Sequence, residues 1–248
     1  LRPLLAIFRK EVLCLLGGPW AFGLLGFWFL LNGFFFSYLL DYSPAVQDDL
    51  GLLPNYLFGS GLLVWLLLPA FPPLLTLALF AEEHRTGSLE SLLTAPVRDW
   101  VIVAGKFMAA AFFFLIFWGG ILCLFLILHS QGAQLEWPKI FIGCFGAFCV
   151  SLLFLATGLW ASSWGGNLIL AAGGGAGLNY AFLFIPVLFE NAPGVAGEWA
   201  AMFHIPNMLD RHFSMGLVDS YALAFFFALT VFFLFLTWLR LAARRLVP

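Results

Sequence analysis

The stretch FAEEHRTGSLESLLTAPVRDW, residues 80–100, interrupts a chain that is otherwise almost uncharged. Asp, Glu, Lys and Arg make up 10% of the 248 residues, whereas hydrophobic residues make up 63%. The charged side chains of this polar stretch are Glu82, Glu83, Arg85, Glu90, Arg98 and Asp99. Long apolar runs precede and follow it. The polar stretch is therefore predicted to be a loop in water between two segments that lie in lipid.

The composition of the whole chain supports a membrane protein. Its mean hydropathy of +1.01 and its 19% of aromatic residues lie far outside the range of soluble domains. One soluble core could not bury this much apolar surface, and a net charge of -2 provides no basic surface for nucleic acid. We therefore expect an all-α polytopic membrane protein that forms a single transmembrane domain over residues 1–248.

Six apolar runs are long enough to cross a membrane, which requires about 20 residues for about 30 Å of hydrocarbon. The expected spans are residues 20–40, 56–80, 101–128, 140–161, 168–189 and 217–239. The first run is long and no small-residue cleavage site follows it, so we expect a retained span and not a signal peptide. An even number of crossings places both ends of the chain on one side.

The basic residues predict which side that is. Under this topology nine of the eleven lie on one face, namely Arg2, Arg9, Lys10, Arg85, Arg98, Lys106, Arg240, Arg244 and Arg245. Only Lys139 and Arg211 lie on the other face. Lys and Arg are enriched in cytoplasmic loops, so both termini and the polar stretch are predicted to be cytoplasmic.

An amphipathic helix is predicted over residues 1–16, before the first span. Apolar residues recur there at helical spacing, at Leu1, Leu4, Leu5, Phe8, Val12 and Leu15. Arg2, Arg9 and Lys10 fall on the other side, which is typical of a helix that lies in the cytoplasmic interface. The alternative is a frayed N-terminus with an accidental apolar stripe.

The polar stretch itself contains the pattern of a short helix. Gly87 interrupts the preceding helix, Ser88 can cap a new one, and Pro96 ends it. Leu89, Leu92 and Leu93 would then form one apolar patch. Such a patch suits docking into a groove on a partner, but the leucines of an ordinary hairpin loop could equally rest on the membrane surface. The residues alone leave both interpretations open.

From Glu82 through Val97 the pattern E-E-x-R-x-G-S-L-E-x-L-L-x-x-P-V resembles the signature of ABC-2 type transporter permeases. In that family the first cytosolic loop carries a coupling helix. The N-terminal segments FRKEV and GGPWAFGLLGFWFLLNGFFF resemble the same family, most closely its gliding-motility and nitrous-oxide-reductase-maturation branch. His84 departs from the Lys or Arg that the family often has, which weakens any charge contact there.

The resemblance implies an ATP-driven pump in the bacterial cytoplasmic membrane, built from two permeases (identical copies or paralogues) and two nucleotide-binding ATPase subunits. By position it assigns docking of the ATPase to Glu82, Glu83, Arg85, Gly87, Leu89, Glu90, Leu92 and Leu93. The chain has no G-x-x-x-x-G-K-[ST] phosphate loop, so ATP and Mg²⁺ are expected on the partner subunit. We expect no catalytic residue and no bound cofactor in this chain, which would act as an exporter. The alternative is a non-transporting membrane partner that relays ATPase-driven motion to an envelope or motility machine, with an accessory envelope protein.

Prolines and glycines within the spans mark two further candidate features. Pro69, Pro72 and Pro73 remove backbone donors from the second span and predict a kink, which is either a hinge or a static bend. Gly173 and Gly177 form a G-x-x-x-G pair in the fifth span, which permits close approach of another helix. Packing within one permease is favoured over contact between two permeases.

The loop between the fifth and sixth spans is too long for a hairpin, and Pro193 and Pro206 predict short helices at the outer interface. His204 and His212 do not predict a metal site, because Pro206 breaks the helix between them. The deep polar residues are Asn32, Asn179 and Tyr180, with Lys106 near the cytoplasmic end. Because an ion-coupled carrier normally needs buried carboxylates or histidines, this set argues against secondary transport. Weakly polar walls would tolerate an amphipathic or lipid-linked substrate.

Overall fold

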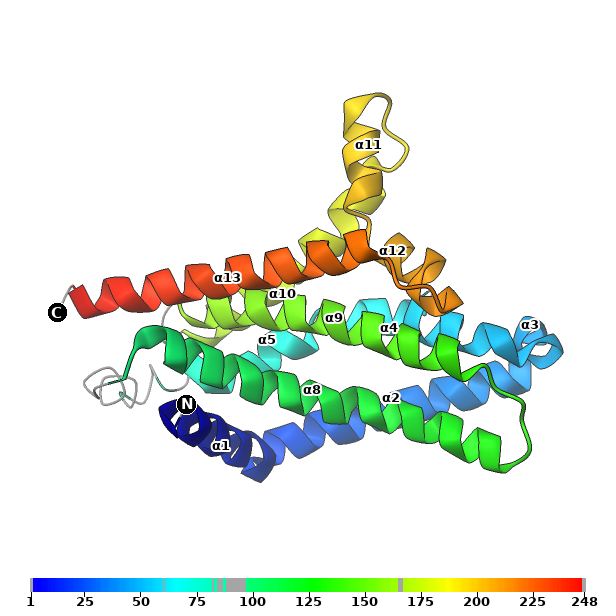
Figure 1. The fold of residues 1–248 in the computed structure, drawn as a ribbon, viewed down its shortest axis with the longest axis horizontal. Helices are drawn as coiled ribbons and strands as arrows, with labels where there is room; N and C mark the ends of the chain where they lie inside the picture. Colours follow the sequence, from blue (N-terminus) through cyan, green and yellow to red (C-terminus); the bar gives the residue numbers. More distant parts are fainter. Residues whose placement is uncertain are drawn as a thin grey trace.

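The computed structural model describes residues 2–59, 61–81, 83, 87, 97–164 and 167–246, which form helices joined by short connections. Its long helices are α2 (Pro19–Tyr42), α8 (Asp99–Ser130), α9 (Trp137–Ser162), α10 (Leu168–Phe189) and α13 (Ser220–Leu246). They lie along one main direction and form an elongated bundle (Figure 1). Within the described ranges these five are long and apolar enough to cross a membrane. The first, third, fourth, fifth and sixth predicted spans are therefore confirmed as helices.

The second apolar segment, residues 55–81, differs from the single kinked helix predicted over 56–80. It consists of a π-helical turn η2 (Asn55–Gly59), α4 (Leu62–Leu67), α5 (Phe71–Thr76) and a second π-helical turn η3 (Leu77–Ala81). Pro72 and Pro73 lack the N–H groups that would continue the helix from α4, and the chain makes a turn at residues 68–70. The described residues of this segment therefore do not form one continuous helix, and a sixth crossing stays a prediction.

Helix α9 lies in the middle of the bundle and is buried along most of its length. It packs against α13, α10, α5 and α8. A Cβ added at Gly146 would lie 2.5 Å from the ring of Phe213, and one at Gly143 would lie 2.8 Å from the ring of Phe58. Small residues thus let neighbouring aromatic side chains reach the backbone of α9.

Helix α1 (Arg2–Gly17) confirms the helix predicted before the first span, and it packs against α8 and α2. Its buried residues are Ile7, Glu11 and Leu15. Leu5, which was predicted to lie on the apolar stripe, is exposed. The helix is thus rotated relative to the predicted stripe, and a carboxylate lies on its buried face.

The predicted short helices between the fifth and sixth spans are also present, as α11 (Val195–Met202), α12 (Ile205–Arg211) and a 3₁₀ turn η4 (Phe213–Met215). Helix α10 contains Pro186, whose missing N–H favours a bend. The last turns of α10 and helix α11 project from the side of the bundle (Figure 1).

Both termini lie at the same end of the bundle, which we call the terminal end (Figure 1). Helix α8 begins there, whereas α3 (Pro44–Asp48) and the connection from α8 to α9 lie at the opposite end. The two termini and the start of α8, which follows the polar stretch, therefore lie at one end of the bundle, as the basic residues predict. That the terminal end faces the cytoplasm stays a prediction.

Candidate functional site

Of the eight residues assigned to ATPase docking, the structure describes Glu83 and Gly87. The other six lie outside the described residues, namely Glu82, Arg85, Leu89, Glu90, Leu92 and Leu93. Gly87 is exposed and has a φ of 75°, a left-handed conformation that favours glycine. This agrees with the predicted interruption at Gly87, while the short helix after it stays a prediction.

Glu83 belongs to a group of four charged residues that we call the ion cluster: Lys10, Glu11, Glu83 and Lys106. Lys106 Nζ lies 2.9 Å from Glu11 Oε1 and 2.8 Å from Glu83 Oε2. Lys10 Nζ lies 2.9 Å from Glu83 Oε1 and 3.3 Å from Glu11 Oε1. Each cation therefore contacts both carboxylates, and the two positive and two negative charges balance.

The ion cluster is mostly shielded from solvent. The side chain of Lys106 is 0% exposed, that of Glu11 4% and that of Glu83 13%, whereas that of Lys10 is 57% exposed. A charge removed from water is costly unless it is paired and hydrogen-bonded. Lys106 meets this requirement, because its ammonium donates to Glu11, pairs with Glu83 and donates to the backbone carbonyl of Leu79 at 2.6 Å. The Phe80 ring adds a cation–π contact at 5.1 Å.

The ion cluster joins three elements of the terminal end. Lys10 and Glu11 belong to α1, Lys106 belongs to α8, and Glu83 follows η3. Leu79 lies within η3, and its backbone carbonyl accepts a hydrogen bond from Lys106. Lys106 thus ties η3 to the neighbouring helix α8.

Lys10 is the exposed member of the cluster, and it remains charged at neutral pH. Burial lowers the pKa of Lys10, but hydrogen bonds and charges from Glu83 and Glu11 outweigh this effect, so the pKa is raised from 10.5. The outer edge of the cluster is therefore permanently cationic near pH 7.

Only part of this site could be predicted from the sequence. The sequence places Lys106 near the cytoplasmic end of its span, and the family resemblance assigns Glu83 to ATPase docking. In the structure Glu83 pairs with the buried Lys106, and its part in docking the ATPase stays a prediction. Glu11 was missed, although its spacing of four residues from both Ile7 and Leu15 places it on their face of the helix.

Two of the deep polar residues, Asn179 and Tyr180, donate to backbone carbonyls at the break in the second apolar segment. Asn179 Nδ2 donates to the carbonyl of Pro69 at 2.9 Å, and Pro73, four residues on, has no N–H to do so. Thr157 donates its hydroxyl to the side-chain oxygen of Asn179, which fixes the amide. Tyr180 donates to the carbonyl of Leu66. Side chains of α9 and α10 thus satisfy backbone carbonyls that Pro73 and the turn at residues 68–70 leave open.

Two glycines pack against this break, Gly158 of α9 and Gly175 of α10. A Cβ at Gly175 would lie 3.0 Å from Pro73 Cβ, whereas a Cβ at Gly173 or Gly177 would meet nothing within 4 Å. Gly173 and Gly177 are exposed. The close approach within the permease, which the spacing motif suggested for Gly173 and Gly177, is therefore made on the opposite face of α10.

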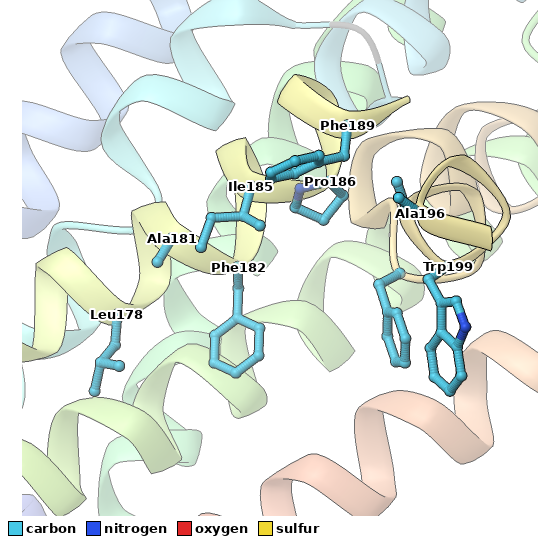
Figure 2. A pocket seen from close by; sticks show the side chains of 10 residues that line it. Leu178, Ala181, Phe182, Ile185, Pro186, Phe189, Ala196 and Trp199 are labelled. Atoms are coloured by element: carbon cyan, nitrogen blue, oxygen red, sulfur yellow. The ribbon is translucent and has the colours of Figure 1, made fainter. Parts of the chain in front are cut away.

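An apolar pocket of about 550 Å³ lies between α10 and α11. It is lined by Leu178, Ala181, Phe182, Ile185, Pro186, Phe189, Ala196, Trp199, Ala200 and Phe203. Figure 2 shows Phe182 of α10 and Trp199 of α11 on two sides of this space. The volume falls within the range of small-molecule sites, about 300–1,000 Å³. With almost entirely apolar walls, the pocket suits the hydrocarbon part of a ligand.

Beside this pocket, polar contacts connect the end of α10 with the start of α12. His204 Nε2 lies 3.6 Å from Glu190 Oε2, and Asn207 donates to Glu190 Oε1 at 3.3 Å. These contacts tie the end of α10 to α12. Among the described residues, no group of three or more His, Cys, Asp or Glu residues is placed to hold a metal ion.

Comparison with known proteins identifies one family. A sequence profile described as an ABC-2 family transporter protein matches residues 26–174, which is more than half of the chain. The matched region runs from α2 into α10 and includes the polar stretch, Glu83 and Lys106. No curated protein sequence matches the chain.

Proposed function

Because the chain belongs to the ABC-2 transporter family and is a membrane component of an ABC transporter, we propose that it exports an amphipathic or lipid-linked substrate. ATP hydrolysis on a separate nucleotide-binding subunit drives this export. The gliding-motility and nitrous-oxide-reductase-maturation branch is the part of the family that we propose for it, on the basis of its N-terminal segments.

One observation above all supports coupling through the polar stretch. The chain leaves η3 and enters α8 at the terminal end, where the ion cluster joins both elements to α1. A partner that moves the polar stretch would therefore act on elements that are already linked to one another. This is the arrangement that an ATPase subunit needs to pass its movement into a bundle.

The substrate class is supported by the pocket between α10 and α11. Its lining offers apolar and aromatic surface and, apart from the indole N–H of Trp199, no polar side-chain group. A fully soluble polar substrate would find no partners there, whereas an acyl or polyprenyl chain would. The direction of transport is proposed from the family resemblance.

We propose further that the working unit contains two permeases, either two copies or this chain with a paralogue. One bundle would supply half of the pathway implied by the resemblance. The exposed face of α10 that carries Gly173 and Gly177 is compatible with such a contact, because small residues allow helices to approach closely. Native mass measurement of the active complex tests this, and a single permease per complex would refute it.

The test of export uses the permease co-purified with its ATPase and reconstituted in liposomes that contain a fluorescent phospholipid. With ATP added on the ATPase side, the probe is expected to leave the leaflet on that side, and an ATPase variant unable to hydrolyse ATP is the control. ATP hydrolysis without movement of the probe would contradict lipid export. If the ATPase remains firmly bound in that case, the result favours the alternative of a membrane partner that relays motion.

A further inference from the structure

We propose that Lys106 is a positioning residue for energy coupling. Its buried ammonium fixes the point at which the second apolar segment ends and the polar stretch begins, and it ties that point to α1 and α8. This inference rests on the proposed function, because coupling to an ATPase is the process that the fixed point would serve.

The ammonium of Lys106 is held by partners from separate elements. It donates hydrogen bonds to Glu11 of α1 and to the Leu79 carbonyl of η3. It also forms an ion pair with Glu83, which lies two residues after η3, at 2.8 Å. Because the side chain is fully buried, water cannot replace any of these partners.

The buried ion pairs at this position serve to fix the relative positions of the elements more than to stabilise the fold. A buried ion pair is often no more stabilising than well-packed apolar residues of the same size, because both charges must lose their water. Apolar surfaces can slide past one another with little change in energy, whereas an ion pair cannot. A shift of α1 or η3 by one turn would leave a carboxylate unpaired in a low-dielectric environment. The ion cluster therefore holds α1, the end of η3 and α8 in one register.

The pair between Lys139 and Glu136 provides an internal contrast. Lys139 Nζ lies 2.9 Å from Glu136 Oε2, but the two residues are three positions apart at the start of α9. Their side chains are 27% and 57% exposed. This pair connects no separate elements, and loss of a surface pair has little effect. It therefore supplies a matched control for substitutions in the ion cluster.

The test must separate positioning from simple stability. Lys106→Met alone leaves two carboxylates with Lys10 as their one cation in the cluster, so this variant could fail merely because it folds poorly. Lys106→Met combined with Glu11→Gln removes one charge of each sign and leaves Lys10 paired with Glu83. The double variant should therefore regain much of the thermal stability that the single variant loses. If Lys106 positions the chain, the double variant should still couple poorly.

The experiment measures fluorescent phospholipid moved per ATP hydrolysed in liposomes that contain the permease and its ATPase. We expect the double variant to lose about tenfold in this ratio, within the range for residues that link distant sites. Lys106→Arg, which keeps the charge and the donors, should retain more coupling than the double variant. Lys139→Met makes the same chemical change at the surface pair and should leave the ratio unchanged. A double variant that is stable and couples like the wild type would overturn the proposal.

A second readout keeps the inference separate from the proposed function. Hydrogen exchange at the backbone amides of residues 77–83 should be faster in the double variant than in the wild type, and unchanged in Lys139→Met. If the wild-type complex hydrolyses ATP but moves no lipid, the proposed export fails while exchange still decides the positioning role. Unchanged exchange in the double variant would overturn the positioning role even if export is confirmed.

Discussion

The ion cluster and the apolar pocket are the two most distinctive regions of the molecule, and they are held together by different forces. In the ion cluster, four charged groups meet with defined partners, and removal of any one leaves the charges unbalanced. In the pocket, α10 and α11 face each other through apolar side chains that have no required partner. Directional contacts specify one arrangement, whereas apolar contacts accept several. The difference indicates a fixed region where a partner acts and an adaptable region where a ligand is bound.

The largest expected effect is an all-or-none difference in the side of the membrane from which two positions can be labelled. Cysteines introduced at Ser88, in the polar stretch, and at Gln47, in α3, should be labelled from opposite sides of the membrane. The expectation follows from the nine-to-two distribution of basic residues and the six predicted spans. Membrane-impermeant thiol reagents applied to intact and to opened cells make the measurement. Labelling of both positions from the same side would reject the six-span topology.

Removal of a charge from the ion cluster should lower the stability of the protein far more than removal of a charge from a surface pair. Glu11→Ala leaves Lys106 and Lys10 with one carboxylate between them, and breaking a buried pair costs about 3–5 kcal/mol. Glu136→Ala removes the partner of Lys139 at the surface, where the cost is about 0–1 kcal/mol. Thermal unfolding of the two purified variants in the same detergent compares them. Equal unfolding temperatures would show that the ion cluster does not hold the terminal end.

The polar stretch should release its partner when its predicted apolar anchors are removed. Anchors in the centre of an interface often contribute about 2 kcal/mol or more, and charges at its rim contribute less. Leu92→Ala with Leu93→Ala should therefore leave the permease inserted but reduce the ATPase recovered with it. Glu90→Ala should have a milder effect that depends on salt. Full recovery and full activity of the double variant would contradict the assignment of a coupling helix.

A smaller loss of stability is expected near the prolines of the second apolar segment. A second substitution there should restore part of it. Asn179→Leu leaves the buried carbonyl of Pro69 without its donor, at a cost of about 1–3 kcal/mol. Pro73→Ala supplies an N–H four residues after Pro69, so the double variant should be more stable than Asn179→Leu alone. Asn32→Leu is the control, because Asn32 donates only to Trp28 in its own helix. Additive losses in the double variant would show that Asn179 does not compensate for Pro73.

The smallest effect on stability is expected in the pocket. Ala181→Leu adds three carbon atoms to a lining position, where open space should accept them for less than about 1 kcal/mol. Binding of a long-chain apolar fluorophore to the purified permease should nevertheless weaken. Ala176→Leu is the control, since Ala176 lies on the same helix outside the lining. Equal binding in both variants would exclude the pocket as the site of the fluorophore.

The sequence predicted the long helices well because polar residues bound each apolar run. It misjudged the second apolar segment, since hydropathy measures composition and takes no account of the N–H groups that Pro72 and Pro73 lack. The G-x-x-x-G spacing identified α10 as a packing helix but selected its exposed face instead of Gly175. Glu11 escaped notice because a charge in an amphipathic helix is normally assigned to the solvent side. Its partner Lys106 is distant in the sequence, and local patterns contain no information about such a contact.

The separation between Glu11 and Lys106 also sets an order of events during synthesis. The two residues are 95 positions apart, so Glu11 leaves the ribosome about 5–20 s before Lys106 at ordinary rates of translation. Throughout that interval the carboxylate of Glu11 must stay hydrated, because its buried partner does not yet exist. Docking of α1 therefore follows insertion of α8, although α1 is made first. The N-terminal helix α1 therefore lies at the membrane surface at first. It completes the ion cluster only after α8, the third predicted span, has been inserted.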